Sequence, residues 1–203
     1  MMFAYAGAQS PAGNGQLWLG FQRTNTVMES ERAAPHAQGM EGMTTGNPGT
    51  STHYPTTNVC FAVYENGNFY FERNEDKTYG KPKVKILTGT LTPQEMQQIK
   101  AVTEQEFFTK ITTPDPPEQP TDAAGMREGE EQTIRVMRNG VLQQFTLVKQ
   151  RFATTSSNGM DKFATNWEKL EKPLKPFLGW VRDMEKKGQA GKEGTPNGCG
   201  FND

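Results

Sequence analysis

Two cysteines have the most distinctive chemistry in this sequence of 203 residues. Cys60 lies in a short apolar stretch, and Cys199 lies in a glycine-rich C-terminal tail. A disulfide between them would tether the tail and close a loop of about 140 residues, which the loop-entropy argument values at about 4 to 5 kcal/mol. Such a bridge would also indicate an oxidising compartment, because cytosolic thiols are kept reduced.

Two alternatives to the bridge stay open at this point. In the first, Cys60 is buried and Cys199 is exposed and unpaired. In the second, one of the thiols is reactive, which requires a nearby base or a positive field. Neither cysteine has a histidine close by in the sequence. An exposed free cysteine in a glycine-rich tail would be an unusual feature to keep, so the bridge is favoured.

The only two histidines, His36 and His53, lie in a polar segment without periodicity. A catalytic triad would need one of them held rigidly against a nucleophile, and a zinc site would need further ligands beside it. We interpret both as solvated. The glycine-rich segments also lack the Lys-Ser/Thr ending of a phosphate-binding loop. The sequence therefore predicts no catalytic residue, no metal site and no cofactor.

Acidic and aromatic residues offer two weaker candidates. The carboxylates near the predicted hairpins are Glu65, Glu72, Glu75, Asp76, Glu128, Glu130 and Glu131. A glycosidase needs two carboxyls that converge across a cleft, but solvated positions are commoner. The candidate binding surface consists of Tyr64, Phe69, Tyr70 and Phe71. Such rings are more often core than ligand platform.

The first hairpin has the clearest turn signal. Asn66-Gly67 separates two β-branched and aromatic stretches, and this dipeptide is typical of a two-residue type I′ turn. That turn would pair Tyr64 with Phe69 and Ala62 with Phe71. The pairing places these side chains together on the expected core face: Cys60, Ala62, Tyr64, Phe69 and Phe71.

Further elements follow at regular intervals. A third strand is expected over 84–89. A helix begins after it, because Thr92 suits the N-cap, Pro93 the first helical position and Glu95 a capping box; it should end near residues 108–110. A proline-rich, acidic loop is expected over 112–131.

The last third of the chain predicts a second hairpin and a helix. Asn139-Gly140 closes the hairpin over 132–149. Apolar residues then recur every three or four positions, but Pro173 and Pro176 should break the helix into pieces over 160–171 and 174–187. The order β-β-β-α-β-β-α predicts an α+β fold, with an antiparallel sheet of about five strands and helices packed on one face.

The ends of the chain have a different composition. Residues 1–9 (MMFAYAGAQ) resemble the end of a signal peptide without its charged start, so we expect either a start site further upstream or a frayed terminus. Residues 10–56 predict a flexible linker around one apolar patch, which would serve as a strand or a docking segment. Residues 57–187 form the predicted domain, and 188–203 form a glycine-rich tail.

Net charge argues against several partners. The chain has 22 Lys and Arg against 23 Asp and Glu, and no run of basic residues. Neither nucleic acid nor anionic lipid is therefore an expected partner. No stretch approaches the roughly 18 apolar residues of a membrane-spanning helix.

Short motifs also carry a resemblance to a known family. They are Val59-Cys60-Phe61, Glu65-Asn66-Gly67, Phe69-Tyr70-Phe71-Glu72-Arg73, Thr88-Gly89-Thr90-Leu91-Thr92 and Asn197-Gly198-Cys199. Over residues 57–200 the chain resembles uncharacterised exported bacterial proteins of acidobacterial type, which contain a domain of unknown function. The resemblance implies a secreted or periplasmic location and strengthens the case for the bridge. It implies no activity.

We therefore expect a non-enzymatic, exported, monomeric or weakly associating domain that binds a protein or an envelope component. Its interacting surface would be an exposed sheet edge or the aromatic hairpin. The alternatives are a hydrolase that uses acidic residues, a subunit of a larger assembly, and a cytoplasmic location.

Overall fold

The computed structural model describes residues 15–27, 56–76, 83–155, 160–195 and 199, and every structural statement below concerns these residues. The elements follow one another as β1 (Leu17–Val27), β2 (Thr56–Tyr64), β3 (Asn68–Asp76), β4 (Lys83–Thr90), α1 (Pro93–Thr103), α2 (Glu106–Thr109), β5 (Ala123–Arg138), β6 (Val141–Thr154), β7 (Lys162–Thr165), α3 (Glu168–Gln189) and β8 (Lys192–Glu193).

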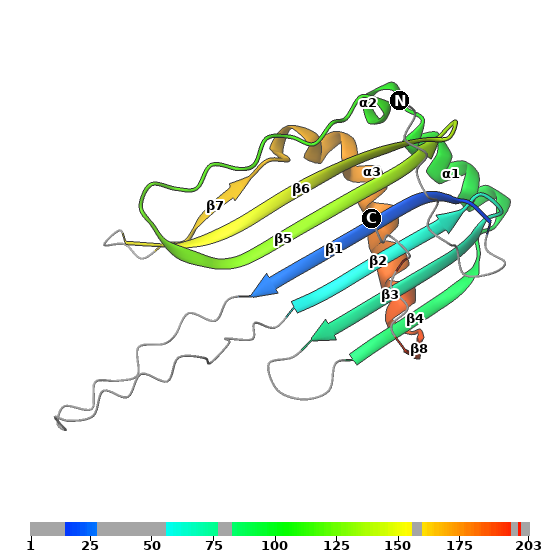
Figure 1. The fold of residues 1–203 in the computed structure, drawn as a ribbon, viewed down its shortest axis with the longest axis horizontal. Coiled ribbons are helices and arrows are strands. Elements are labelled where there is room, and N and C mark those ends of the chain that lie inside the picture. Colours follow the sequence, from blue (N-terminus) through cyan, green and yellow to red (C-terminus); the bar gives the residue numbers. More distant parts are fainter. Residues whose placement is uncertain (1–14, 28–55, 77–82, 156–159, 196–198, 200–203) are drawn as a thin grey trace, which may run out of the picture.

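All strands form one antiparallel sheet, in the spatial order β7-β6-β5-β1-β2-β3-β4-β8. Helix α3 crosses one face of this sheet, and α1 and α2 lie near the end where the β2–β3 and β5–β6 hairpins turn (Figure 1). The α+β class is confirmed. The predicted number of about five strands is wrong, because the described sheet has eight. The helix packing is also less uniform than predicted, since α1 and α2 sit at one end of the sheet.

Strand β1 is the largest departure from the sequence prediction. It lies within the predicted linker 10–56, yet it occupies the interior of the sheet and pairs with β2 on one side and β5 on the other. Leu19 and Phe21 are fully buried. The strand alternative for the apolar patch is confirmed, because β1 begins at Leu17. The polar second half of the strand has no apolar alternation, so the sequence did not identify that half as β-structure. Its backbone is satisfied by the two neighbouring strands instead.

The first hairpin has a different register from the one predicted. Val63 pairs with Phe69, and Phe61 pairs with Phe71. The Gly67 N–H donates to the Tyr64 carbonyl over 2.9 Å, and Gly67 adopts a positive φ of 84°. The loop between Tyr64 and Asn68 thus has three residues instead of the two of a type I′ turn, and the additional residue comes from the first strand. A shift of one residue exchanges the faces of a strand, so Phe69 and Phe71 point away from Cys60.

The second hairpin has the predicted turn. Asn139 and Gly140 both adopt positive φ, at 49° and 76°, and Arg138 pairs with Val141 across them. Its strands are longer than the predicted range 132–149, because β5 already begins at Ala123, inside the predicted acidic loop.

The C-terminal helix is continuous. Pro173 and Pro176 lie inside α3, and residues 162–165 form β7 instead of a first helical piece. The buried side chains of α3, including Leu174 and Phe177, hold the helix on the sheet in spite of the prolines. Figure 1 shows α3 changing direction early in its course, as prolines cause helices to do. The prediction of two separate helices is therefore wrong.

The side chains that face the helices line up in rows across the sheet, because paired residues point to the same side. One row is entirely apolar and consists of Phe145, Ile134, Phe21, Phe61, Phe71 and Leu87. The next row toward Val27 consists of Leu147, Gln132, Arg23, Val59, Arg73 and Lys85. The main hydrophobic core therefore ends where β1 and β5 change from aromatic and aliphatic residues to Arg23 and Gln132.

The predicted capping box at the start of α1 is confirmed. The Thr92 N–H donates to Glu95 Oε2 over 2.8 Å, and the Glu95 N–H donates to Thr92 Oγ1 over 3.2 Å. These hydrogen bonds to Thr92, assisted by Lys187, lower the pKa of Glu95 below its ordinary value.

We expect Thr92→Ala to lower the free energy of unfolding by about 1 kcal/mol, as loss of an N-cap does.

The stabilising contribution of Glu95 should depend on pH. Because its folded-state pKa is lowered, Glu95 stabilises the fold above the unfolded pKa of about 4.3, and this stabilisation is lost as the pH falls through the folded pKa. The free energies of unfolding of the wild type and Glu95→Ala, measured with urea, should therefore differ less in acid than at neutral pH. Gln98→Ala, on the exposed side of α1, serves as control. A difference that stays constant down to about pH 3 would contradict this account.

Candidate functional site: a polar pocket beneath the long helix

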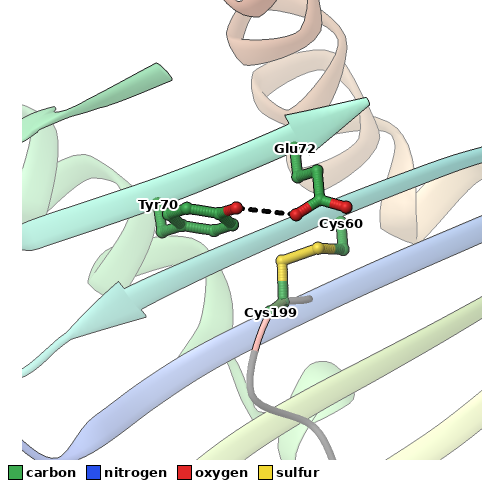
Figure 2. Close-up of a disulfide and its surroundings, with 4 residues drawn as sticks. All are labelled: Cys60, Tyr70, Glu72 and Cys199. Atoms are coloured by element: carbon green, nitrogen blue, oxygen red, sulfur yellow. Dashed lines mark hydrogen bonds between the residues drawn. A yellow bond between two sulfur atoms is a disulfide. The ribbon is translucent and has the colours of Figure 1, made fainter. Parts of the chain in front are cut away.

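The disulfide between Cys60 and Cys199 is present, with the two Cα atoms 5.8 Å apart (Figure 2). It lies on the face of the sheet opposite the helices, where Cys199 packs against Ala62, Tyr64 and Tyr70. The loop-entropy estimate for its separation of 139 residues is about 5 kcal/mol of stabilisation. The bridge is thus confirmed, and the alternatives of an exposed or reactive thiol are excluded.

The predicted aromatic binding surface does not exist as one surface. Tyr64 and Tyr70 are buried beside the disulfide, whereas Phe71 is buried on the helix side and Phe69 packs against that core. The Tyr70 hydroxyl donates to Glu72 Oε2 over 2.6 Å, as Figure 2 shows. The register shift in the first hairpin separates the four rings, so this prediction is wrong.

The predicted carboxylates are distributed over several environments. Glu72 is buried beside Tyr70, Glu75 pairs with Arg73 and Glu128 pairs with Arg151. Glu131 is exposed. Glu65 is exposed as well, and the Asp76 side chain lies outside the described part of the structure. The described carboxylates do not converge as a group, and Glu130 is the one that reaches the pocket described next.

Other predictions concern metals and membranes. His36 and His53 lie outside the described residues. Within the described part of the chain, no group of three or more His, Cys, Asp or Glu residues is arranged to hold a metal ion. No helix among these residues has the length and apolar character required to cross a membrane.

A pocket of about 310 Å³ lies between α3 and strands β1, β5 and β6. We call it the polar pocket, and it is lined by Phe21, Arg23, Glu130, Gln132, Lys149, Trp167, Glu171, Leu178, Val181, Arg182 and Glu185. It forms where the apolar row that contains Phe21 gives way to the row that contains Arg23 and Gln132. Helix α3 covers both rows, and its last turns bring a carboxylate over the polar one.

That carboxylate belongs to Glu185, which pairs with Arg23. Arg23 Nη2 donates to Glu185 Oε2 over 2.9 Å. The Arg23 side chain is 21% exposed to solvent and the Glu185 side chain is 10% exposed. An ion pair so shielded from water interacts more strongly than a surface pair, but it also carries a desolvation cost. The pair therefore needs its remaining polar atoms to find partners.

Three polar atoms of the pocket find none within the described chain. Gln132 Oε1 and Glu185 Oε1 accept no hydrogen bond there, and Arg23 Nε donates none. Gln132 Nε2 donates to the Glu130 carboxylate. An ionised carboxylate only accepts hydrogen bonds, so this contact fixes which end of the Gln132 amide points toward Glu130. Gln132 Oε1 must consequently face away from Glu130. The residues that line the pocket thus include two buried acceptors and one buried donor without a partner in the described chain.

Sequence reasoning missed most of this site, including Arg23, Gln132 and Glu185. A signal was present in the period-two pattern of the strands, since Arg23 follows Phe21 by two residues and Gln132 precedes Ile134 by two. In α3, Glu185 follows Val181 by four residues, which places it on the apolar face. A charged residue that continues a buried stripe is a candidate for a buried polar site.

No protein-family model matches this chain, and a search of the curated proteins finds no match. The chemistry of the polar pocket therefore rests on its own geometry.

We expect Arg23→Met and Glu185→Leu each to lower the free energy of unfolding by about 2 kcal/mol, because each leaves a largely buried charge without its partner. The double variant should lose clearly less than the sum of the two, as measured by a double-mutant cycle in urea. The exposed pair Lys110–Glu106, with side chains 72% and 82% exposed, is the matched control. A coupling energy for Arg23 and Glu185 no larger than that of the control would refute a buried, interacting pair.

Proposed function

We propose that this protein is an extracytoplasmic, non-enzymatic binding domain that holds a small polar ligand in the polar pocket. One observation carries the proposal. Gln132 and Glu185 are only 5% and 8% exposed, and each has a buried oxygen that no donor in the described chain satisfies. An unsatisfied buried polar group costs about 1 to 3 kcal/mol. A bound molecule with hydrogen-bond donors would remove that cost once the two side chains turn these oxygens toward the pocket.

The extracytoplasmic location is supported by the disulfide. A cross-link between the half-buried Cys60 and the buried Cys199 suits an oxidising compartment. The resemblance of residues 57–200 to exported bacterial proteins of acidobacterial type supports the same location. An envelope-associated binding domain accounts for both features.

A thiol count on protein from its native host tests the location. We expect an intact mass lower than the reduced chain by two hydrogens and no thiol that reacts before denaturation and reduction. Alkylation during cell lysis prevents later oxidation and serves as the control. Two free thiols in the freshly alkylated protein would rule out an oxidising compartment.

A hydrolase is the second candidate, because three carboxylates, those of Glu130, Glu171 and Glu185, line the pocket. Two of them already have partners, since Glu130 accepts from Gln132 and Glu185 accepts from Arg23. Glu171 is exposed at the pocket rim. This arrangement supports binding better than general acid–base catalysis, in which a carboxyl must exchange a proton with the substrate.

Native mass spectrometry of the protein incubated with a small-molecule extract of bacterial cells tests ligand binding. We expect a one-to-one complex that Leu178→Trp abolishes by filling the pocket. Leu142→Trp, on an exposed position of β6, should leave the complex intact, and circular dichroism should show that both variants are folded.

Identical spectra for the wild type and the folded Leu178→Trp variant would refute the pocket as a binding site. A ligand that is converted over time by the wild type but not by Glu171→Gln would replace the binding domain with the hydrolase.

A further inference from the structure

We propose that the ligand of the polar pocket is a small zwitterion of the α-amino-acid type, with an ammonium group, a carboxylate and an apolar side chain. This inference rests on the proposed binding function and adds the chemical class of the ligand. Three observations carry it: the unpartnered acceptors, the balance of charges, and the apolar part of the lining.

The ammonium group matches the two buried acceptors among the lining residues, which would turn toward the pocket to reach it. Gln132 Oε1 and Glu185 Oε1 are acceptors without donors in the described chain, and an ammonium has three donors and no acceptor. A hydrogen bond from a cation to a carboxylate is about twice as strong as a neutral one. Trp167 also lines the pocket, and tryptophan is the aromatic residue that attracts cations best.

The carboxylate matches the cationic side of the pocket. Arg23 Nε has no acceptor within the described chain. Lys149 and Arg182 line the pocket at exposed positions, and Lys149 Nζ lies 5.5 Å from the centre of the Phe163 ring. A ligand carboxylate would lie close to these rim cations and would accept from Arg23 Nε once that side chain turns toward the pocket.

The charges of the lining balance. Three cationic residues, Arg23, Lys149 and Arg182, face three carboxylates, those of Glu130, Glu171 and Glu185. A ligand with a single charge would leave an uncompensated charge in a partly buried site, which is costly. A zwitterion keeps the balance, as a neutral ligand does, and it alone gives each sign a charged partner.

The rest of the lining is apolar. Phe21, Leu178 and Val181 border the same pocket, so an apolar or aromatic side chain would find contact there. The volume of about 310 Å³ lies at the lower end of the usual range for small-molecule pockets, about 300 to 1,000 Å³. It suits a single amino acid better than an oligomer.

A matched panel of probes tests the ligand class by isothermal titration calorimetry. The probes are L-phenylalanine, its amine counterpart 2-phenylethylamine, its acid counterpart 3-phenylpropanoate, and glucose as a neutral polyol. We expect L-phenylalanine to bind with a dissociation constant at least about tenfold lower than either counterpart, since each counterpart loses one charged contact. Equal binding of the amine or the acid, or binding of glucose alone, would overturn the zwitterion proposal.

Variants locate the binding in the pocket. Gln132→Met retains the length of the side chain but removes the acceptor, and it should weaken L-phenylalanine binding by at least about tenfold. Lys149→Met should weaken the amino acid and the acid probe but leave the amine unchanged. Glu131→Gln, one residue away and exposed on β5, should change nothing. Thermal unfolding verifies that each variant is folded before it is titrated.

The two proposals fail in different ways. If cell extract gives a complex that Leu178→Trp abolishes but no probe of the panel binds, the zwitterion proposal is wrong and the binding function stands. If neither the extract nor the panel gives a complex, both proposals are wrong. Binding of L-phenylalanine that Gln132→Met does not weaken would also overturn the assigned site.

Discussion

The two ladders of β1 hold the sheet together. This strand pairs with β2 and β5, which lie far from it in the sequence, and it joins the β2–β3–β4 meander to the β5–β6 hairpin. It also sends Leu19 and Phe21 into the core and Arg23 into the polar pocket. Core and candidate site therefore depend on the same strand. Such non-local pairing carries a loop-closure cost that the buried contacts must offset.

Helix α3 is positioned by the core and in turn completes the pocket. Phe177 makes edge-on contacts with Phe21 and Phe108, with ring centroids 6.2 and 5.5 Å apart, and Trp180 contacts Phe61 at 4.9 Å. Edge-on ring contacts have preferred distances and angles, so they restrict both the distance of the helix from the sheet and its rotation about its own axis. Further along α3, the Gly188 Cα approaches the Phe71 ring so closely that a Cβ there would lie 2.1 Å from it. Between these two contacts, Glu185 reaches Arg23.

The two faces of the sheet have separate roles. One face contains the disulfide and its small cluster of Ala62, Tyr64 and Tyr70, and the other contains the main core and the polar pocket. The cross-link limits the conformations of the unfolded chain, whereas the pocket depends on contacts of the folded state. Stability that comes from the cross-link is thus available to offset the cost of buried polar atoms on the opposite face.

Local signals were sufficient wherever a few neighbouring residues decide the structure. The capping box at Thr92 and Glu95 and the type I′ turn at Asn139-Gly140 belong to this class, because their hydrogen bonds and φ values are set within one turn of chain. Pairing of the two cysteines was also favoured from the sequence. Tertiary structure alone decided the place of β1, the register of the first hairpin and the continuity of α3. Each depends on partners distant in the chain, and so does the polar pocket, whose residues meet only when β1, β5, β6 and α3 are assembled.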